Sequence, residues 1–185
     1  GNRCKDECLP EETNRRIVDI ISDVNLCYSE QARTYLHDCG LPKERTYVTG
    51  SPMAEVLHAN LAEIEASDVH KRLNLEKGKY ILLSAHREEN IDTEKNFLNL
   101  FNAINAIAER YNMPILYSCH PRSRNRLAAT NFKLDPRVIQ NEPLGFHDYN
   151  CLQMNAFAVI SDSGTLPEES SFFTSVGHPF PAVCI

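Results

Sequence analysis

The sequence predicts an α/β fold built on a parallel sheet with helices on both faces. From residue 79 onward, short apolar runs alternate with segments whose apolar residues recur at helical spacing. The apolar runs show no polar alternation, which is typical of strands buried on both faces. With 185 residues, 42% of them hydrophobic and 24% charged, the chain can bury a substantial core. Strands that alternate with helices in this way predict a parallel sheet.

The first 49 residues predict a smaller set of elements. Pro10 stands at a first helical position with acidic residues behind it, and Gly40 ends a second helix that Ser29 caps. Glu11 and Arg15 are four residues apart and share a helix face, where the simplest interpretation is a surface ion pair. The apolar stripe expected on the first helix consists of Ile17, Ile20, Ile21 and Val24. Short strands are expected at 26–28 and 46–48.

A turn at 49–52 is the expected domain junction, and the residues after it supply the main sheet. One long helix is expected at 53–73. Strands are expected at 80–85, 114–119, 138–140 and 156–160, with a further strand beginning near residue 180. Helices are expected after the first of these strands, where Phe97, Phe101, Ile104 and Ala108 form one stripe, then through Leu127, at 146–155 and after 165.

The stretch 156–169 combines a buried strand, a turn of small residues and a helix start. Thr165 and Glu168 have the spacing of a capping box, with Pro167 between them. Free backbone N–H groups and the helix dipole at such a junction favour a phosphate or carboxylate. Ser163 can add a hydroxyl, and Gly164 lets a ligand approach the backbone closely. An ordinary strand-to-helix turn without a ligand also fits these residues.

Polar residues follow three of the expected strands. They are His86-Arg87-Glu88, His120-Pro121-Arg122 and Ser161-Asp162-Ser163-Gly164. Ligands of parallel α/β sheets bind beyond the carboxyl ends of the strands. Each segment alone fits a solvated loop. Three such segments on one rim of the sheet, two of which contain an arginine, favour an anionic ligand such as a nucleotide diphosphate.

Composition excludes several classes of function. The net charge of −6, with mixed signs along the chain, argues against nucleic-acid binding through a broad basic surface. The sequence contains no run of about 18 apolar residues, which a membrane span would need, and it shows no signal-peptide pattern. Seven cysteines without a CxxC pair favour a reduced, cytoplasmic protein without a metal site. The absence of an initial methionine and the strand-like last residues suggest that the chain is a fragment.

Four motifs in order along the chain resemble the non-hydrolysing UDP-N-acetylglucosamine 2-epimerase family. They are Pro10-Glu11-Glu12 with Asn14-Arg15, Thr49-Gly50-Ser51-Pro52, Ser84-Ala85-His86-Arg87-Glu88-Glu89-Asn90, and Ser161-Asp162-Ser163-Gly164 with Glu168-Glu169. The opening GNRC and the Ser-Pro of the second motif look closer to the capsule and O-antigen branch. Members of that branch act on UDP-2-acetamido-2,6-dideoxy sugars on the way to N-acetyl-L-fucosamine.

The resemblance implies a two-lobed fold like that of GT-B glycosyltransferases, with the active site between two Rossmann-like lobes. On this mapping, residues 1–49 are the tail of the N-terminal lobe. Residues 50–185 are the C-terminal, UDP-binding lobe, incomplete at its end. The resemblance also implies a UDP-sugar substrate, no cofactor and a full-length homodimer that serves surface-polysaccharide synthesis.

The family's reaction inverts C2 of the sugar. A base removes the C2 proton while UDP leaves C1 in an anti elimination, and UDP adds back after a proton reaches the other face. Acid and base groups on opposite faces and a cationic clamp on the diphosphate serve this chemistry. The resemblance implies catalytic roles for Glu11, Arg15 and His86. It assigns the diphosphate turn to Ser163 and Gly164, the ribose to Glu169, and the uracil to Tyr149 and to the backbone at Leu144.

Three alternatives share this architecture. A UDP-2-acetamido-2,6-dideoxy-L-talose 2-epimerase would use the same residues on another sugar. A GT-B glycosyltransferase would bind the UDP-sugar in the same way but has no need for paired acid and base groups at C2, so Glu11, Arg15 and His86 distinguish it. A nucleotide-sugar sensor without activity would keep Ser163 and Glu169 but not Glu11.

Overall fold

The computed structural model describes residue 3 and residues 10–91, 93–119 and 121–185. The chain divides into two compact units, Gly1–Pro52 and Met53–Ile185. The junction expected from the sequence after residue 49 lies three residues before this division. No helix in the described ranges is both long and apolar enough to cross a membrane.

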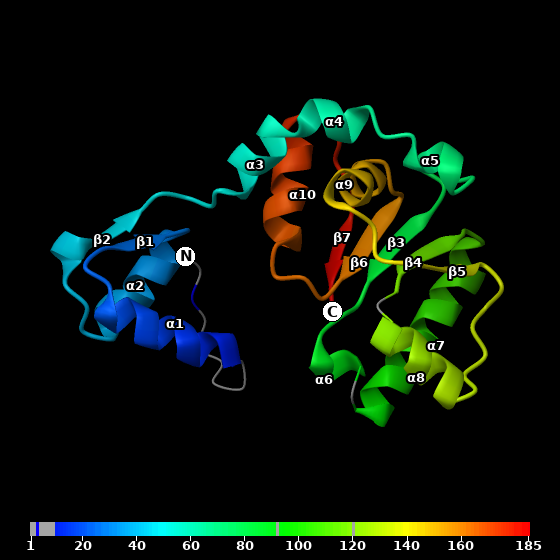
Figure 1. Cartoon of the computed structure of the whole chain (residues 1–185), viewed down its shortest axis with the longest axis horizontal. Helices are drawn as coiled ribbons and strands as arrows, with labels where there is room; N and C mark the ends of the chain where they lie inside the picture. The colour runs from blue at the N-terminus through cyan, green and yellow to red at the C-terminus, as the bar shows by residue number, and fades with distance from the viewer. Residues whose placement is uncertain (1–2, 4–9, 92, 120) are drawn as a thin grey trace. The chain divides into compact units, whose positions relative to one another are not determined.

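In its described residues, the first unit is a small parallel pair of strands with two α-helices and a 3₁₀ turn (Figure 1). Asn25, Leu26 and Cys27 of β1 pair in register with Thr46, Tyr47 and Val48 of β2. Its elements are α1 (Pro10–Ile21), β1 (Asn25–Cys27), α2 (Glu30–Asp38), the 3₁₀ turn η1 (Lys43–Arg45) and β2 (Thr46–Val48). The expected cap is confirmed, because the Ser29 hydroxyl accepts a hydrogen bond of 3.2 Å from the Ala32 N–H.

The apolar stripe expected on α1 is exposed in this unit. Ile17 is 55% exposed, and Ile20 and Ile21 are each 75% exposed, while Val24 lies beyond the end of the helix. The buried cluster of the unit is formed instead by Cys27, Ala32 and Leu36, between α2 and the strand pair. Helical spacing therefore located α1 correctly but did not predict burial of its apolar face.

The second unit contains a five-stranded parallel sheet in the order β5-β4-β3-β6-β7. The predicted parallel sheet with alternating helices is confirmed. The strands are β3 (Ile81–Ser84), β4 (Ile115–Ser118), β5 (Val138–Asn141), β6 (Ala158–Ser161) and β7 (Ala182–Cys184). The helices are α3 (Met53–Ala59), α4 (Leu61–Glu65), α5 (Val69–Arg72), α6 (Glu88–Ile91), α7 (Glu94–Tyr111), α8 (Pro121–Ala129), α9 (Phe146–Met154) and α10 (Leu166–Ser175).

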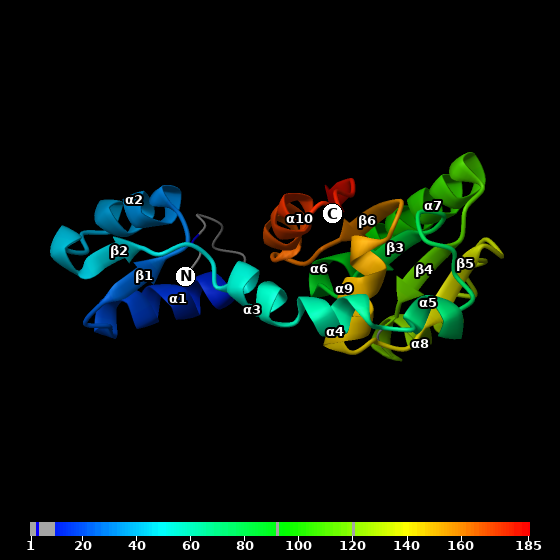
Figure 2. The ribbon, with the colours of Figure 1, turned by 90° about the horizontal axis from the view of Figure 1, so that it is seen from above.

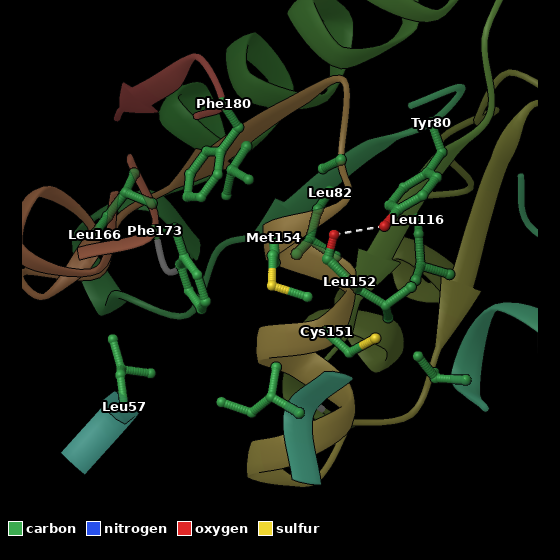
Figure 3. Packing of buried hydrophobic residues seen from close by; sticks show 14 of the residues in the cluster. Leu57, Tyr80, Leu82, Leu116, Cys151, Leu152, Met154, Leu166, Phe173 and Phe180 are labelled. Atoms are coloured by element: carbon green, nitrogen blue, oxygen red, sulfur yellow. Dashed lines mark hydrogen bonds between the residues drawn. The ribbon is translucent and has the colours of Figure 1, made fainter. Parts of the chain in front are cut away.

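Side chains that alternate along the strands form a hydrophobic cluster on each face of the sheet. Leu82, Leu116 and Val159 pack against helices α3, α4, α5, α9 and α10, and Figure 3 shows part of this cluster. Leu83 and Tyr117 face the other way, toward α7 and α8. The stripe predicted on α7 is confirmed on this second face, where Phe97, Phe101, Ile104 and Ala108 are buried.

The single long helix expected at 53–73 is wrong, because three short helices occupy this segment (Figure 2). The first break is at Asn60, whose side-chain amide donates a hydrogen bond of 2.8 Å to the Val56 carbonyl. At the second break the Ser67 hydroxyl accepts from the Val69 N–H at 3.2 Å and contacts Asp148 of α9 at 2.6 Å. Polar side chains that bond to nearby backbone compete with helix continuation, which explains the breaks.

Candidate functional site

The chain reverses its direction of sheet growth between β3 and β6. It runs from β3 outward through β4 to β5, then returns to place β6 on the other side of β3. Ser84 and Ser161, the last residues of these two strands, are register partners. The loops that follow β3 and β6 are therefore neighbours at the point where open α/β sheets bind ligands.

Asp162 joins the two loops. Its carboxylate Oδ2 accepts hydrogen bonds from the His86 and Arg87 N–H groups, each at 2.8 Å, and from the Asn90 side chain at 3.2 Å. Its carbonyl accepts from Arg87 Nε at 2.7 Å. Asp162 is 6% exposed, so these donors replace water around a buried carboxylate. His86 and Arg87, which precede α6, are thereby held beside the 163–164 turn.

The turn after β6 has a different internal structure from the one expected. Helix α10 begins at Leu166 with Pro167 in its first turn, as predicted, but the Thr165 side chain makes no cap hydrogen bond. The Thr165 hydroxyl donates to Glu169 Oε1 at 2.7 Å and lies 2.9 Å from the Ser163 hydroxyl. Ser163 Oγ accepts from the Thr165 N–H at 3.3 Å. The expected capping box is wrong because Thr165 pairs with Glu169, one residue beyond the capping position.

Ser163 and Gly164 are exposed at the end of this turn. The Arg87 guanidinium brings a positive charge to the same place, with Nη2 3.8 Å from where a Cβ on Gly164 would lie. A small-residue turn, a hydroxyl and a guanidinium at a helix start form a suitable arrangement for a phosphate group.

Glu169 lies one turn into α10 and is held from two sides. Its Oε2 accepts a hydrogen bond of 2.8 Å from the Gln153 amide of α9, and its Oε1 accepts from Thr165. Gln153 is fully buried, and its own carbonyl oxygen has no partner among the described residues. The carboxylate is thus fixed between α9 and α10 on the same side of the turn as Ser163.

Tyr149 of α9 lies beneath the ends of β3 and β6. Burial raises the pKa of Tyr149 to about 12, and hydrogen bonds with the Ser84 and Ser161 side chains oppose this shift. The ring is half-buried and packs against the hydrophobic cluster on the α9 side, as does Leu144 just before the helix. Both residues assigned to the uracil therefore pack against the hydrophobic cluster on the α9 side of the sheet.

Glu11 and Arg15 belong to the first unit. Both side chains are exposed on α1, and Arg15 lies 3.9 Å from Glu12, the residue after Glu11. Glu12 is 1% exposed and also forms ion pairs with Arg3 at 2.9 Å and Arg16 at 3.6 Å. The second glutamate of the Pro-Glu-Glu motif is therefore a buried anchor of the helix, whereas the first is directed to solvent.

Three remaining points concern His120, a possible metal site and Asp162. His120, in the polar segment after β4, lies outside the described residues. In the described ranges, no group of three or more His, Cys, Asp or Glu residues is arranged to hold a metal ion. Sequence reasoning missed Asp162 as a connecting residue, although its position inside the Ser-Asp-Ser-Gly motif was a signal for it.

Comparison with known proteins identifies the family. A family model described as UDP-N-acetylglucosamine 2-epimerase matches residues 1–177. The chain belongs to the UDP-N-acetylglucosamine 2-epimerase family. The UDP-N-acetylglucosamine 2-epimerase of Methanocaldococcus jannaschii is 31% identical over 177 residues, which cover 92% of this chain.

Solved structures of family members have the same fold. The UDP-N-acetylglucosamine 2-epimerase of Rickettsia bellii matches 98% of this chain with 39% identity and a TM-score of 0.84, and the match covers 47% of that chain. The Methanocaldococcus jannaschii enzyme, solved in complex with UDP-GlcNAc and UDP, matches 97% with 30% identity and a TM-score of 0.85, covering 50% of that chain. These matches confirm a GT-B-like, Rossmann-like fold. The chain spans 48% of the length of the Methanocaldococcus jannaschii relative.

Proposed function

We propose that this chain is the UDP-binding lobe, with part of the neighbouring lobe, of an enzyme that interconverts UDP-N-acetylglucosamine and UDP-N-acetylmannosamine. The observation that carries the proposal is the combination of family membership with an anion-suited turn at the reversal point of the sheet. Residues 1–49 correspond to the tail of the N-terminal lobe and residues 50–185 to the C-terminal lobe.

The nucleotide contacts lie on the β6–α10 segment, on α9 and just before α9. Ser163 and Gly164 bind the diphosphate, because both are exposed at the turn beside the Arg87 guanidinium. Glu169 accepts hydrogen bonds from the ribose hydroxyls, and Thr165 and Gln153 fix its carboxylate for this role. Tyr149 and the backbone at Leu144 contact the uracil.

His86 acts at the leaving oxygen of UDP. The Asp162 carboxylate holds its backbone N–H at 2.8 Å, next to the diphosphate turn. Negative charge develops on the diphosphate as the C1–O bond breaks, and a donor placed there stabilises this charge or supplies a proton. Glu11 and Arg15 complete the acid and base groups at C2, and their assignment rests on the Pro-Glu-Glu motif with Asn14-Arg15.

The proposal also covers the location, cofactor need and oligomeric state of the enzyme. We place it in the cytoplasm, where it acts without a cofactor as a homodimer in the synthesis of surface-polysaccharide precursors. The sugar distinguishes it from its nearest alternative, the 2,6-dideoxy epimerase, because that substrate lacks the 6-hydroxyl of UDP-N-acetylglucosamine.

The test is deuterium incorporation at C2. The full-length enzyme that carries this chain is incubated in D₂O with UDP-N-acetylglucosamine and, separately, with the 2,6-dideoxy substrate, each with and without a sugar acceptor, and the products are examined by mass spectrometry and NMR. We expect deuterium at C2 together with formation of the manno epimer. Incorporation only into the 2,6-dideoxy substrate would move the proposal to that branch. Sugar transfer to an acceptor without exchange at C2 would replace it with a glycosyltransferase.

A further inference from the structure

Asp162 directs all three of its polar groups toward β3 and the loop that follows it. The Asp162 N–H donates to the Ser84 carbonyl at 3.2 Å, and the Asp162 carbonyl accepts from Arg87 Nε at 2.7 Å. The carboxylate takes the His86 and Arg87 N–H groups and the Asn90 amide. These contacts join residues more than 70 positions apart in the sequence.

The chemistry of the contacts requires a carboxylate or a close substitute. Oδ2 accepts three hydrogen bonds, and Oδ1 accepts only a longer bond of 3.1 Å from the same His86 N–H. Asparagine in the same rotamer keeps an acceptor at the Oδ2 position, but its NH₂ group replaces Oδ1 and faces the His86 N–H, so donor meets donor there. Alanine removes every carboxylate contact, and the His86 and Arg87 N–H groups lose their bonds to a charged acceptor.

We infer that Asp162 is a positioning residue for the reaction, because its carboxylate fixes the backbone of the loop that carries His86 against the 163–164 turn. This inference rests on the proposed function. In this role Asp162 acts through the backbone of His86. A displacement of about 1 Å of a catalytic group costs up to about 10²-fold in rate, so loss of the anchor should slow the reaction.

Kinetics of single and double variants test this role in the full-length enzyme. We expect Asp162→Ala to lower kcat by about 10²-fold, with KM changed by less than about threefold, because the uracil and ribose contacts lie on other residues. Asp162→Asn should recover part of the lost kcat, because it keeps the acceptor at the Oδ2 position. The Asp162→Ala/His86→Ala double variant should match His86→Ala alone within about threefold, since both changes remove the same contribution.

Amide hydrogen exchange provides a readout that does not depend on turnover. In Asp162→Ala, the His86 and Arg87 amides should exchange about tenfold faster or more, because both lose a charged acceptor. Asp135 provides the matched control: its carboxylate also accepts three hydrogen bonds, from the Arg137 N–H, Nε and Nη2, just before β5. Asp135→Ala should speed exchange at Arg137 and leave kcat unchanged.

Three results decide the inference. Additive losses of kcat in the double variant, or unchanged exchange at His86 and Arg87, would overturn it. An equal loss of kcat in Asp135→Ala would also overturn it, because general destabilisation would then explain the effect. If the wild-type enzyme incorporates no deuterium at C2, the proposed function and the kinetic part of the inference fail, and the exchange measurement alone decides whether Asp162 anchors the loop.

Discussion

At the scale of single residues, Gly164 is a position where the fold tolerates a side chain but the proposed ligand does not. Its φ angle lies outside the left-handed region, and an added Cβ would meet only Arg87 Nη2, at 3.8 Å, among the described atoms near it. That distance is an ordinary van der Waals contact. A side chain at this position is therefore compatible with the folded chain and would interfere only with a group that approaches the backbone from outside.

The prediction is that Gly164→Ala weakens UDP binding without changing stability. We expect the dissociation constant for UDP to rise by about tenfold or more, which corresponds to about 1.4 kcal/mol, because a methyl group occupies the approach to the turn. Titration calorimetry measures the affinity, and thermal unfolding of the same variant is the control. A wild-type affinity for UDP in the alanine variant would place the diphosphate elsewhere.

His86 provides a second residue-scale prediction, in the full-length enzyme. His86→Ala should lower kcat far more than it raises KM, because the charge that the imidazole meets develops only in the transition state. His86→Asn keeps a hydrogen-bond donor but cannot transfer a proton. Near-normal kcat in Asn with a loss in Ala would indicate an electrostatic role, and a loss in both would indicate proton transfer. Normal turnover in both variants would leave His86 with a structural role only.

At the scale of elements, a buried network of polar groups connects α5 and α9 through Tyr80, the residue before β3. The Tyr80 hydroxyl donates to the Leu152 carbonyl, as the dashed line in Figure 3 marks, and therefore accepts from His70 Nε2 at 2.9 Å. This assigns the proton of neutral His70 to Nε2 and leaves Nδ1 as an acceptor, 3.8 Å from the Cys151 thiol. Burial, with a smaller contribution from Lys77, lowers the pKa of His70.

The buried His70 in this network predicts a loss of stability in mild acid. Because the pKa of His70 is lower in the folded state, the unfolded chain binds more protons once the pH falls below the ordinary histidine value of about 6.5. The stabilisation is therefore present above that pH and is lost as the pH falls toward the folded-state pKa. The urea midpoint should drop between pH 7.5 and pH 5.5 by less in His70→Gln than in wild type. An equal drop in the two proteins would contradict this account.

His147 is the matched control for that experiment. Its imidazole is exposed and contacts Asn60 Oδ1 at 3.0 Å, so it lies outside the buried polar network of His70 and Tyr80. His147→Gln should keep the wild-type dependence of the urea midpoint on pH. A change as large as that of His70→Gln would show that the acid sensitivity does not arise from the buried network.

Elements were predictable from the sequence where local patterns decide them. The strands at β2 and β3, the Ser29 cap and the α7 stripe follow from periodicity and capping chemistry, and all are confirmed. The breaks at Asn60 and Ser67 were missed because side-chain hydrogen bonds to the backbone interrupt a helical pattern without Gly or Pro. The bonds of Asp162 depend on the strand order, which the sequence pattern does not contain.

At the scale of the whole molecule, the chain corresponds to about half of the length of its relatives. It spans 48% of the length of the Methanocaldococcus jannaschii relative. The proposed nucleotide contacts all lie after residue 140, whereas Glu11 and Arg15 are on the first unit. Binding of UDP is therefore expected to need the second unit, whereas turnover of the sugar is expected to need Glu11 and Arg15 of the first unit as well.

We predict that the 185-residue chain alone does not catalyse epimerisation. Each general acid or base step contributes about 10²- to 10⁴-fold, and this chain spans only 48% of the length of the Methanocaldococcus jannaschii relative. Incubation of the purified chain with UDP-N-acetylglucosamine in D₂O should give no deuterium at C2. Measurable epimerisation by the chain alone would show that the catalytic groups have been misassigned.

The central claim, that the turn after β6 holds the nucleotide, is tested most directly by titrating UDP into the 185-residue chain and its Ser163→Ala/Glu169→Ala variant. We expect the unchanged chain to bind UDP weakly but measurably. The dissociation constant of the variant should rise by about tenfold or more, because a diphosphate contact and a charged ribose contact are both lost. Equal affinity of the two proteins for UDP would contradict the claim.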